Sequence, residues 1–358
     1  MTTSTETTDV RAGLIGYGYA GKTFHAPMML ATRGLALAAV ASSDPAKVGR
    51  DLPDVEVIAD PQALIARDDI ELVVIASPNA SHAPLAATAL AAGKHVVVDK
   101  PFTLNLAEAR KVVALAEAQE QLLAVFHNRR WDSDFLGVRQ AIQSGLLGRV
   151  THFESHFDRF RPEVRQRWRE GPGPGSGIWF DLGPHLIDQA LQLFGLPQRV
   201  QADLAMQRSG ALTDDWAHVV LDYGALRVIL HAGMMVAGGS SRFVVHGEKG
   251  SLVKRKPDPQ EAQLLSGMTP GSPGWGTDDD DMLFYDGSGD ERRIAAPAGD
   301  QLSFYRGVAD AVRGAAPNPV PPIEALTVMA VLEAAAESAR DGRTVALPLT
   351  ERERAALA

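Results

Sequence analysis

Up to Phe126 the chain alternates short apolar runs with longer segments rich in Ala and Leu. The apolar runs are rich in Val, Ile and Leu, as expected for strands that are buried on both faces of a parallel sheet. They are Val10–Ile15, Leu35–Ala41, Val55–Ile58, Leu72–Ala76, His95–Val98 and Leu122–Phe126. With helices between most of them, this alternation predicts an α/β fold with a Rossmann-type, doubly wound parallel sheet.

After Arg130 the pattern changes to long, half-polar strands. A helix at Asp134–Ser144 and a glycine-bounded turn precede a predicted strand at Val150–Arg161. Further strands are predicted at Val200–Ala205, Trp216–Tyr223, Leu226–Ala232 and Arg242–His246, with a helix at Ile178–Phe194. We therefore expect a Rossmann domain over residues 10–128 and an α+β substrate and oligomerisation domain over 129–350, whose open, mainly antiparallel sheet has one free face.

The residue pattern in the last part of the chain predicts a long loop and a long helix. Residues Ser266–Gly289 are rich in Gly, Pro, Ser and Asp, including the run Asp278–Asp281, and we expect an exposed loop without chemistry. An apolar helix at Ile323–Arg340 follows a proline-rich link and is long enough to cross back to the first domain.

The amino-acid composition limits the classes of molecule that the protein is expected to bind. The net charge of −9 disfavours nucleic acid and anionic membranes, which favours a small-molecule ligand. The chain has no cysteine, which excludes disulfides and thiolate ligands and suits a reducing compartment. Thr2–Asp9 resembles neither a signal peptide nor a transit helix, and we expect a disordered tail. A soluble, cytoplasmic protein without a membrane span is expected.

A glycine-rich loop follows the first predicted strand. It reads Gly16, Tyr17, Gly18, Tyr19, Ala20, Gly21 and precedes a helical segment, the context of a dinucleotide fingerprint. In such a loop Gly16 permits the tight turn, Gly18 lets the backbone approach the pyrophosphate, and Gly21 allows close helix packing. The alternative is a structural glycine-rich turn.

The end of the second strand bears on the choice of cofactor. Ser42, Ser43 and Asp44 stand there, and a carboxylate accepts hydrogen bonds from an adenosine ribose and repels a 2′-phosphate. This favours NAD, while the nearby Lys47 keeps NADP possible. Alternatively, Asp44 only caps a helix that starts at Pro45.

Three residues are candidates for the chemistry of alcohol oxidation. Lys100 follows the strand His95–Val98, at the edge where open α/β sheets bind ligands. Asp181 and His185 are four residues apart and share a face if the segment is helical, although Pro184 leaves the register open. A neutral imidazole is a suitable base near neutral pH. Alternatively, Lys100 is a solvated surface charge, Asp181 a helix cap and His185 a buried core residue.

Together, the glycine loop, Lys100 and the Asp181/His185 pair resemble the Gfo/Idh/MocA oxidoreductases, over essentially the whole chain. Asp99 stands where the family usually has Glu before the lysine and proline. The segments Thr23–Pro27, Phe126–Asp132 and Asp158–Arg165 are similar to the scyllo-inositol dehydrogenase branch.

The resemblance implies oxidation of a ring hydroxyl of scyllo-inositol or a similar polyol to an inosose, with reduction of NAD. His185 would accept the proton, Lys100 would position the hydroxyl, and Asp181 would hold the site through hydrogen bonds. It also implies a loop beside the nicotinamide ribose at Ser77, Pro78 and Asn79, with His82 as a further cofactor candidate. The candidates for substrate binding are Arg130, His156, Arg159, Arg161 and Asp188, and the arginines are alternatively a solvated strand edge or dimer salt bridges.

Other expectations concern metals, assembly and competing functions. The mechanism needs no metal, and the histidines show no HExxH-like spacing. The free sheet face should expose apolar residues and be covered in a homodimer or homotetramer. Two functions compete with the dehydrogenase: a nonenzymatic dinucleotide sensor, and an NAD-dependent glycosidase with no net turnover of cofactor.

Overall fold

The computed structural model describes residues 9–357, so the expected N-terminal tail lies, apart from Asp9, outside the described residues. The first sheet is wholly parallel, in the order β3-β2-β1-β4-β5-β6. Its strands are β1 (Val10–Ile15), β2 (Leu35–Ala41), β3 (Glu56–Ile58), β4 (Leu72–Ile75), β5 (His95–Val98) and β6 (Leu123–Val125). This order confirms the predicted doubly wound, Rossmann-type sheet.

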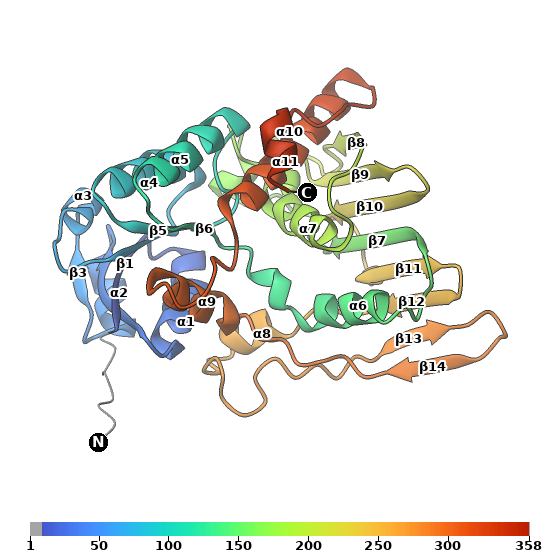
Figure 1. Ribbon diagram of the computed structural model, residues 1–358, viewed down its shortest axis with the longest axis horizontal. Helices are drawn as coiled ribbons and strands as arrows, with labels where there is room; N and C mark the ends of the chain where they lie inside the picture. The colour runs from blue at the N-terminus through green and yellow to red at the C-terminus, as the bar shows by residue number, and fades with distance from the viewer. Residues whose placement is uncertain (1–8, 358) are drawn as a thin grey trace.

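Short helices connect these strands and cover both sheet faces (Figure 1). They are η1 (Gly21–His25), α1 (Ala26–Ala31), α2 (Pro45–Asp51), α3 (Pro61–Ile65), η2 (Asn79–Ser81), α4 (His82–Ala91) and α5 (Leu106–Ala118). The strand interiors are fully buried, since β4 and the Val-rich centre of β5 have no exposed side chain. Burial on both faces explains why these strands are continuous apolar runs in the sequence.

The second sheet is mixed, in the order β14-β13-β12-β11-β7-β10-β9-β8. Only β7 and β10 pair in parallel. Its strands are β7 (Val150–Asp158), β8 (Arg199–Ala205), β9 (Trp216–Tyr223), β10 (Leu226–Gly233), β11 (Phe243–Gly247), β12 (Gly250–Lys254), β13 (Met282–Tyr285) and β14 (Glu291–Ile294). The predicted open, mainly antiparallel sheet is confirmed. The strand β7 ends at Asp158, however, so Arg159 to Arg161 lie beyond it.

The expectation of an exposed loop over Ser266–Gly289 is wrong in part. Strand β13 lies within this segment, and β12 and β14 beside it were also not predicted. The acidic run binds a buried ammonium, because Lys254 Nζ lies 3.1 Å from Asp278 Oδ2 and 2.7 Å from Asp280 Oδ2. The side chain of Lys254 is fully buried, so these carboxylates supply the partners that a buried charge requires.

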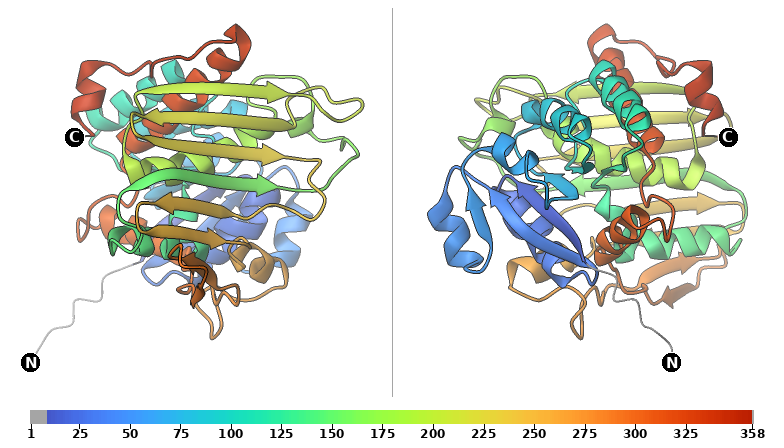
Figure 2. Two further views of the ribbon diagram at one scale, coloured as in Figure 1. Left: turned by 90° about the vertical axis from the view of Figure 1, so that its right-hand side faces the viewer. Right: turned by 60° about the vertical axis from the view of Figure 1, so that its left-hand side comes forward.

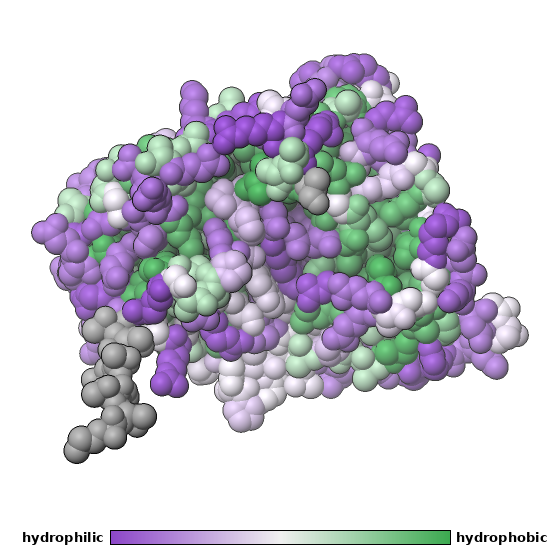
Figure 3. All heavy atoms as spheres, viewed as in Figure 1, coloured by the Kyte–Doolittle hydropathy of each residue, from purple (hydrophilic) through white to green (hydrophobic). Residues whose placement is uncertain are grey.

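The remaining helices pack on one face of the second sheet and between the two sheets (Figure 1). They are η3 (Asn128–Trp131), α6 (Ser133–Gln143), η4 (Trp168–Glu170), α7 (Ile178–Phe194), α8 (Gln260–Leu265), α9 (Leu302–Val312), α10 (Pro322–Asp341) and α11 (Glu351–Ala355). Helix α10 contacts α5 and β6 on one side and α7 and β8 on the other. In the space-filling view, hydrophobic groups remain visible beside α7, between α10 and α6 (Figure 3).

No helix of residues 9–357 covers the opposite face of the second sheet (Figure 2, left). We expected every second residue of its strands to expose an apolar side chain on this face. Half-buried apolar side chains such as Val220, Ile229 and Val244 do lie there. Histidines occupy much of the rest: His152 pairs with His246 across β7 and β11, and His231 lies between His156 and His218. The face is therefore a mixture of apolar and titratable groups.

Within residues 9–357, no helix combines the length and apolarity needed to cross a membrane.

Candidate active site

The glycine loop places three glycines in three different environments. Gly16 has φ +98°, and a Cβ there would lie 2.6 Å from the carbonyl oxygen of Ala76. A Cβ on Gly21 would lie 2.1 Å from the carbonyl oxygen of Gly16, so the helix start packs directly on the turn. Around Gly18 no atom of the described part of the chain lies within 4 Å of such a Cβ. The turn and the close packing need glycine for internal reasons, while Gly18 leaves open space for a ligand to reach the backbone.

This loop borders a cavity of about 520 Å³ at the carboxyl ends of β1, β2 and β4. The predicted cofactor residues that line it are Gly16, Tyr17, Gly18, Tyr19, Ser42, Ser43, Asp44, Ser77 and Pro78. An open glycine and a helix N-terminus facing such a cavity fit the pyrophosphate of a dinucleotide.

The position of Asp44 allows both roles considered for it, as a helix cap and as a contact for the ribose. Its side chain accepts a hydrogen bond of 3.0 Å from the backbone N–H of Lys47, which makes Asp44 the N-cap of α2. It also lines the cavity, at the end of β2, where the ribose of a dinucleotide is expected to bind. Lys47 lines the same cavity, and its Nζ donates to the carbonyl oxygen of Tyr17 over 2.8 Å.

Two other predicted cofactor residues are tied to the protein and line neither cavity. Asn79 is buried, and its Nδ2 donates to the carbonyl oxygen of Gly175 over 3.0 Å. His82 is fully buried between the carbonyl oxygens of Pro101 and Ser77, at 2.8 and 2.9 Å. These contacts hold the loop after β4 and the turn after Lys100 in place, which is a positioning role.

Lys100 stands at the carboxyl end of β5, where a second cavity of about 450 Å³ adjoins the first. Its Nζ donates to the backbone oxygen of Asp181 over 2.6 Å and to Asp181 Oδ1 over 3.1 Å. An ammonium has three protons, so one remains for a ligand in the cavity. Beneath it, burial alone would raise the pKa of Asp99, but the contact with His25 and the charge of Lys100 lower it to about 2.

Asp181 and His185 line this cavity from the N-terminal half of α7. The helix continues through Pro184, which lies in its second turn and lacks the N–H for one ladder hydrogen bond. Asp214 receives the N–H groups of the first turn, since the backbone N–H of Trp179 donates to its Oδ2 over 2.8 Å. The predicted four-residue spacing therefore does place both side chains on one helix face.

The electrostatics of this pair suit proton transfer. Burial opposes ionisation of Asp181, yet the charges of Lys100 and Arg169 hold its pKa below the ordinary range. Burial and the charges of Lys100 and Arg129 lower the pKa of His185 well below its usual value. At neutral pH Asp181 is thus a carboxylate and His185 a neutral imidazole, the form in which a histidine side chain can accept a proton.

Several cavity residues were not predicted as site residues. They are Phe24 from η1, Phe126, Asn128 and Arg129 after β6, Arg165, Arg167, Trp168 and Arg169 after β7, and Glu261 from α8. The arginines repeat at odd positions between 159 and 169, a period of two that predicts one shared side of an extended segment. Glu261 carries no comparable sequence signal, because it reaches the cavity only through the tertiary position of α8.

Three residues predicted to bind substrate lie away from the cavity lining. The guanidinium of Arg130 is buried and pairs with Asp188 over 2.6 Å and with Glu324 over 2.6 Å. His156 lies on the helix-free sheet face, where its Nε2 contacts Glu154 over 2.8 Å. We therefore correct these predictions: Arg130 and Asp188 form an internal ion pair, and only Arg159 and Arg161 of the predicted set face the cavity.

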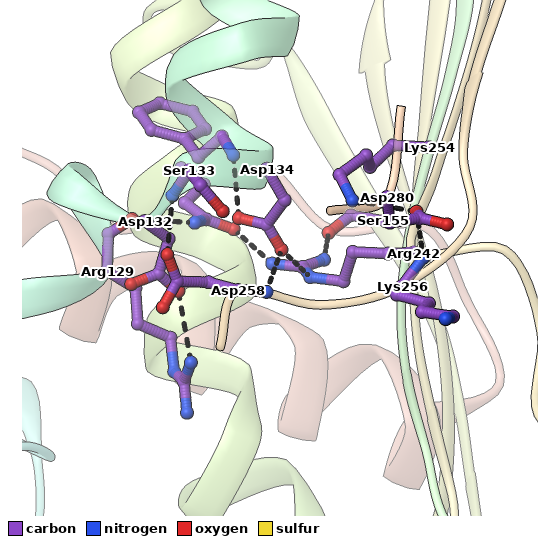
Figure 4. A network of polar contacts seen from close by, with 12 residues as sticks. Arg129, Asp132, Ser133, Asp134, Ser155, Arg242, Lys254, Lys256, Asp258 and Asp280 are labelled. Atoms are coloured by element: carbon purple, nitrogen blue, oxygen red, sulfur yellow. Dashed lines mark hydrogen bonds and ion pairs between the residues drawn. The ribbon is translucent and has the colours of Figure 1, made fainter. Parts of the chain in front are cut away.

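A polar network behind the cavity fixes the position of Arg129 (Figure 4). Arg129 binds Asp132 over 3.0 Å on one side and Glu261 over 3.0 Å on the other. Burial and the neighbouring Asp258 raise the pKa of Asp132 well above its ordinary value. Further along, the buried Arg242 donates to Asp134 over 3.1 Å. The network connects η3, α6 and the second sheet, so the cavity wall is anchored to the core.

Comparison with known proteins follows the same division of the chain. The model of the NAD-binding Rossmann fold of the Gfo/Idh/MocA oxidoreductases matches residues 10–127, and that of their C-terminal alpha/beta domain matches residues 139–347. The chain is 50% identical to an uncharacterized oxidoreductase, YdgJ, of Escherichia coli over 95% of its length and 99% of the relative. It is 36% identical to the scyllo-inositol 2-dehydrogenase (NADP(+)) IolW of Bacillus subtilis, over 94% and 96%.

Among solved structures, a protein from Klebsiella pneumoniae described as an oxidoreductase superposes with a TM-score of 0.93 at 60% identity, covering 98% of both chains.

Proposed function

The chain belongs to the Gfo/Idh/MocA oxidoreductase family, and on that premise we propose that it oxidises a secondary hydroxyl of a cyclitol or sugar to a ketone with NAD. The observation that carries the proposal is the meeting of Lys100, Asp181 and His185 in one cavity that adjoins the glycine-loop cavity. The names of relatives support the substrate class, since IolW and an inositol 2-dehydrogenase of Rhizobium meliloti act on inositols.

Each residue has a defined part in this proposal. When bound, the nicotinamide supplies the acceptor for the hydrogen on carbon. Lys100 donates its remaining proton in a hydrogen bond to the reacting oxygen and stabilises negative charge that develops there. Asp181 holds Lys100 through two contacts, and His185 accepts the hydroxyl proton in its neutral form.

We favour NAD as the cofactor, because the carboxylate of Asp44 suits hydrogen bonds from a ribose that carries no 2′-phosphate. IolW is named for NADP, and Lys47 lies in the same cavity. The experiment therefore compares NAD with NADP.

The experiment follows absorbance of reduced nicotinamide while inositols and aldoses are offered with NAD or NADP. Wild type is compared with Lys100→Ala and His185→Ala, and with Lys111→Ala, which removes an exposed lysine of α5, as the control. We expect turnover in wild type and control, and a loss of about 10² to 10⁴-fold in both site variants with cofactor binding retained. Tight cofactor binding without turnover of any polyol would favour the sensor, and cleavage of glycosides without net absorbance change would favour the glycosidase.

We also propose that a second copy of the chain covers the helix-free sheet face in a homodimer or homotetramer. Its half-buried apolar residues, such as Val220 and Ile229, support this. Light scattering that gave a strict monomer at micromolar concentration would contradict it.

A further inference from the structure

The cavity that contains Lys100 and His185 is unusually rich in guanidinium groups. Its arginines are Arg129, Arg159, Arg161, Arg165, Arg167 and Arg169, against the carboxylates of Asp99, Asp181 and Glu261. Five of the six come from the segment that runs on from β7, at alternating positions. With Lys100 the lining carries more positive than negative charges, although the whole chain has a net charge of −9.

Three of these arginines have protein carboxylate partners. Arg129 pairs with Asp132 and Glu261, Arg167 with Glu170 over 2.6 Å, and Arg169 approaches Asp181 at 3.5 Å.

The other three do not. Among residues 9–357, no carboxylate lies within ion-pair distance of Arg159, Arg161 or Arg165, and no side-chain hydrogen bond satisfies their guanidinium groups. Burial and the charges of Arg159, Arg165 and Arg167 lower the pKa of Arg161, which reflects repulsion among neighbouring guanidinium groups.

The bound cofactor does not account for these three charges. Arg169 and Trp168 line both cavities, which places them where the dinucleotide would pass from one to the other. Arg159, Arg161 and Arg165 line only the cavity with Lys100 and His185. They therefore face the space left for the second reactant.

Unpaired guanidinium groups beside a reaction centre match an anion. Their planar, multiple N–H donors fit the oxygens of a carboxylate or phosphate, and such pairs are stronger than contacts with neutral hydroxyls. A neutral cyclitol would leave these three guanidinium groups without an ion-pair partner. An anionic ligand would relieve the repulsion and be held in one orientation.

We propose that the physiological substrate is a polyol or sugar that carries a carboxylate or phosphate, bound by Arg159, Arg161 and Arg165 while its reacting hydroxyl lies between Lys100 and His185. This inference rests on the proposed dehydrogenase function and specifies its substrate class. The cavity of about 450 Å³ is within the usual range for small-molecule sites and has room for a six-carbon sugar derivative.

Binding is measured first, because it does not require turnover. Isothermal titration calorimetry on the full chain saturated with NADH compares D-glucuronate and D-glucose 6-phosphate with neutral D-glucose and scyllo-inositol. We expect at least one anion to bind about tenfold or more tightly than both neutral compounds, with an affinity that falls as salt rises. Comparison of the two anions distinguishes a carboxylate from a phosphate site, and inorganic phosphate should compete with the tighter one.

Variants locate the anion. Arg159→Gln, Arg161→Gln and Arg165→Gln should each weaken binding of the anion about tenfold. Arg161→Lys keeps the positive charge but loses the planar pair of N–H donors, so its affinity should lie between those of wild type and Arg161→Gln. Arg33→Gln removes an exposed charge beyond α1 and should bind like wild type. Melting temperatures show whether each variant is folded.

The outcomes separate this inference from the proposed function. Anion binding lost in the arginine variants, without turnover of any compound, would sustain the anion site and overturn only the dehydrogenase. Turnover of neutral polyols together with no preferential binding of glucuronate, glucose 6-phosphate or phosphate would overturn the anionic substrate and sustain the dehydrogenase.

Discussion

Individual residues at the site combine structural and chemical roles, and Asp44 is the clearest case. Its carboxylate caps α2 through the N–H of Lys47 and also lines the cofactor cavity. A sequence pattern cannot separate the two roles, because both need an oxygen at the end of the second strand.

The substitution Asp44→Asn separates them. It keeps the capping oxygen and removes the charge, so the melting temperature should change little while the preference for NAD over NADP falls about tenfold or more. Asp44→Ala should lose the same selectivity and in addition about 1 kcal/mol of stability. The ratio of kcat/KM with the two cofactors, measured beside thermal unfolding, decides this; unchanged selectivity in Asp44→Asn would leave only the capping role.

Arg130 differs from Asp44, because it was predicted to bind substrate but forms ion pairs with carboxylates of the protein itself. Its charge is satisfied by Asp188 and Glu324. Removing one partner of a buried pair leaves an uncompensated charge, which costs about 3–5 kcal/mol. Arg130→Met should therefore lower the free energy of unfolding with little effect on KM. A KM raised tenfold in a variant of unchanged stability would return Arg130 to the substrate.

At the scale of single elements, the glycine loop offers a test in which two neighbouring substitutions act differently. Gly21→Ala would place a Cβ 2.1 Å from the carbonyl oxygen of Gly16, and should destabilise the fold by about 1–3 kcal/mol. Gly18→Ala meets no protein atom within 4 Å, so folding should be unchanged while the dissociation constant of the cofactor rises. Thermal unfolding and cofactor titration of both variants check this contrast. Equal cofactor affinity in Gly18→Ala and wild type would mean that the pyrophosphate does not approach there.

Elements with strong periodicity could be predicted from the sequence, and those held by distant partners could not. The bounds of β1, β2, α7 and β9 agree with their apolar patterns. Strand β13 was missed because it is short and follows an acidic, glycine-rich stretch. That stretch is ordered around Lys254, and neither a period nor a turn signal reveals a buried ion pair between residues so far apart.

The same distinction applies to the site. Strand ends and helix spacing predicted Lys100, Asp181 and His185 as candidates, and the structure places all three at one cavity. The sequence could not show that Arg130 turns toward Asp188 and away from the cavity, nor that Glu261 reaches it, since both depend on how separate elements pack.

The whole molecule should be sensitive to mild acid because it buries neutral histidines. Burial lowers the pKa of His127 from 6.5 to about 4, and it also lowers the pKa of His185. The unfolded chain binds these protons at a higher pH than the native one, so the stabilisation is complete above pH 6.5 and is lost as the pH falls from there toward 4. Thermal unfolding against pH should show this decline, with a smaller slope in His127→Gln. A melting temperature constant between pH 7 and 5 would contradict it.

The position of α10 has a consequence for how reactants enter and leave. One helix is packed at once against α5 and β6 and against α7 and β8, so a rigid-body rotation of one sheet layer against the other would have to break its buried contacts. Closure by a hinge between the layers is therefore disfavoured. We therefore expect access to Lys100 and His185 to depend on the arginine-bearing segment after β7, which lines the same cavity, and the rate of product release to follow the motion of that segment.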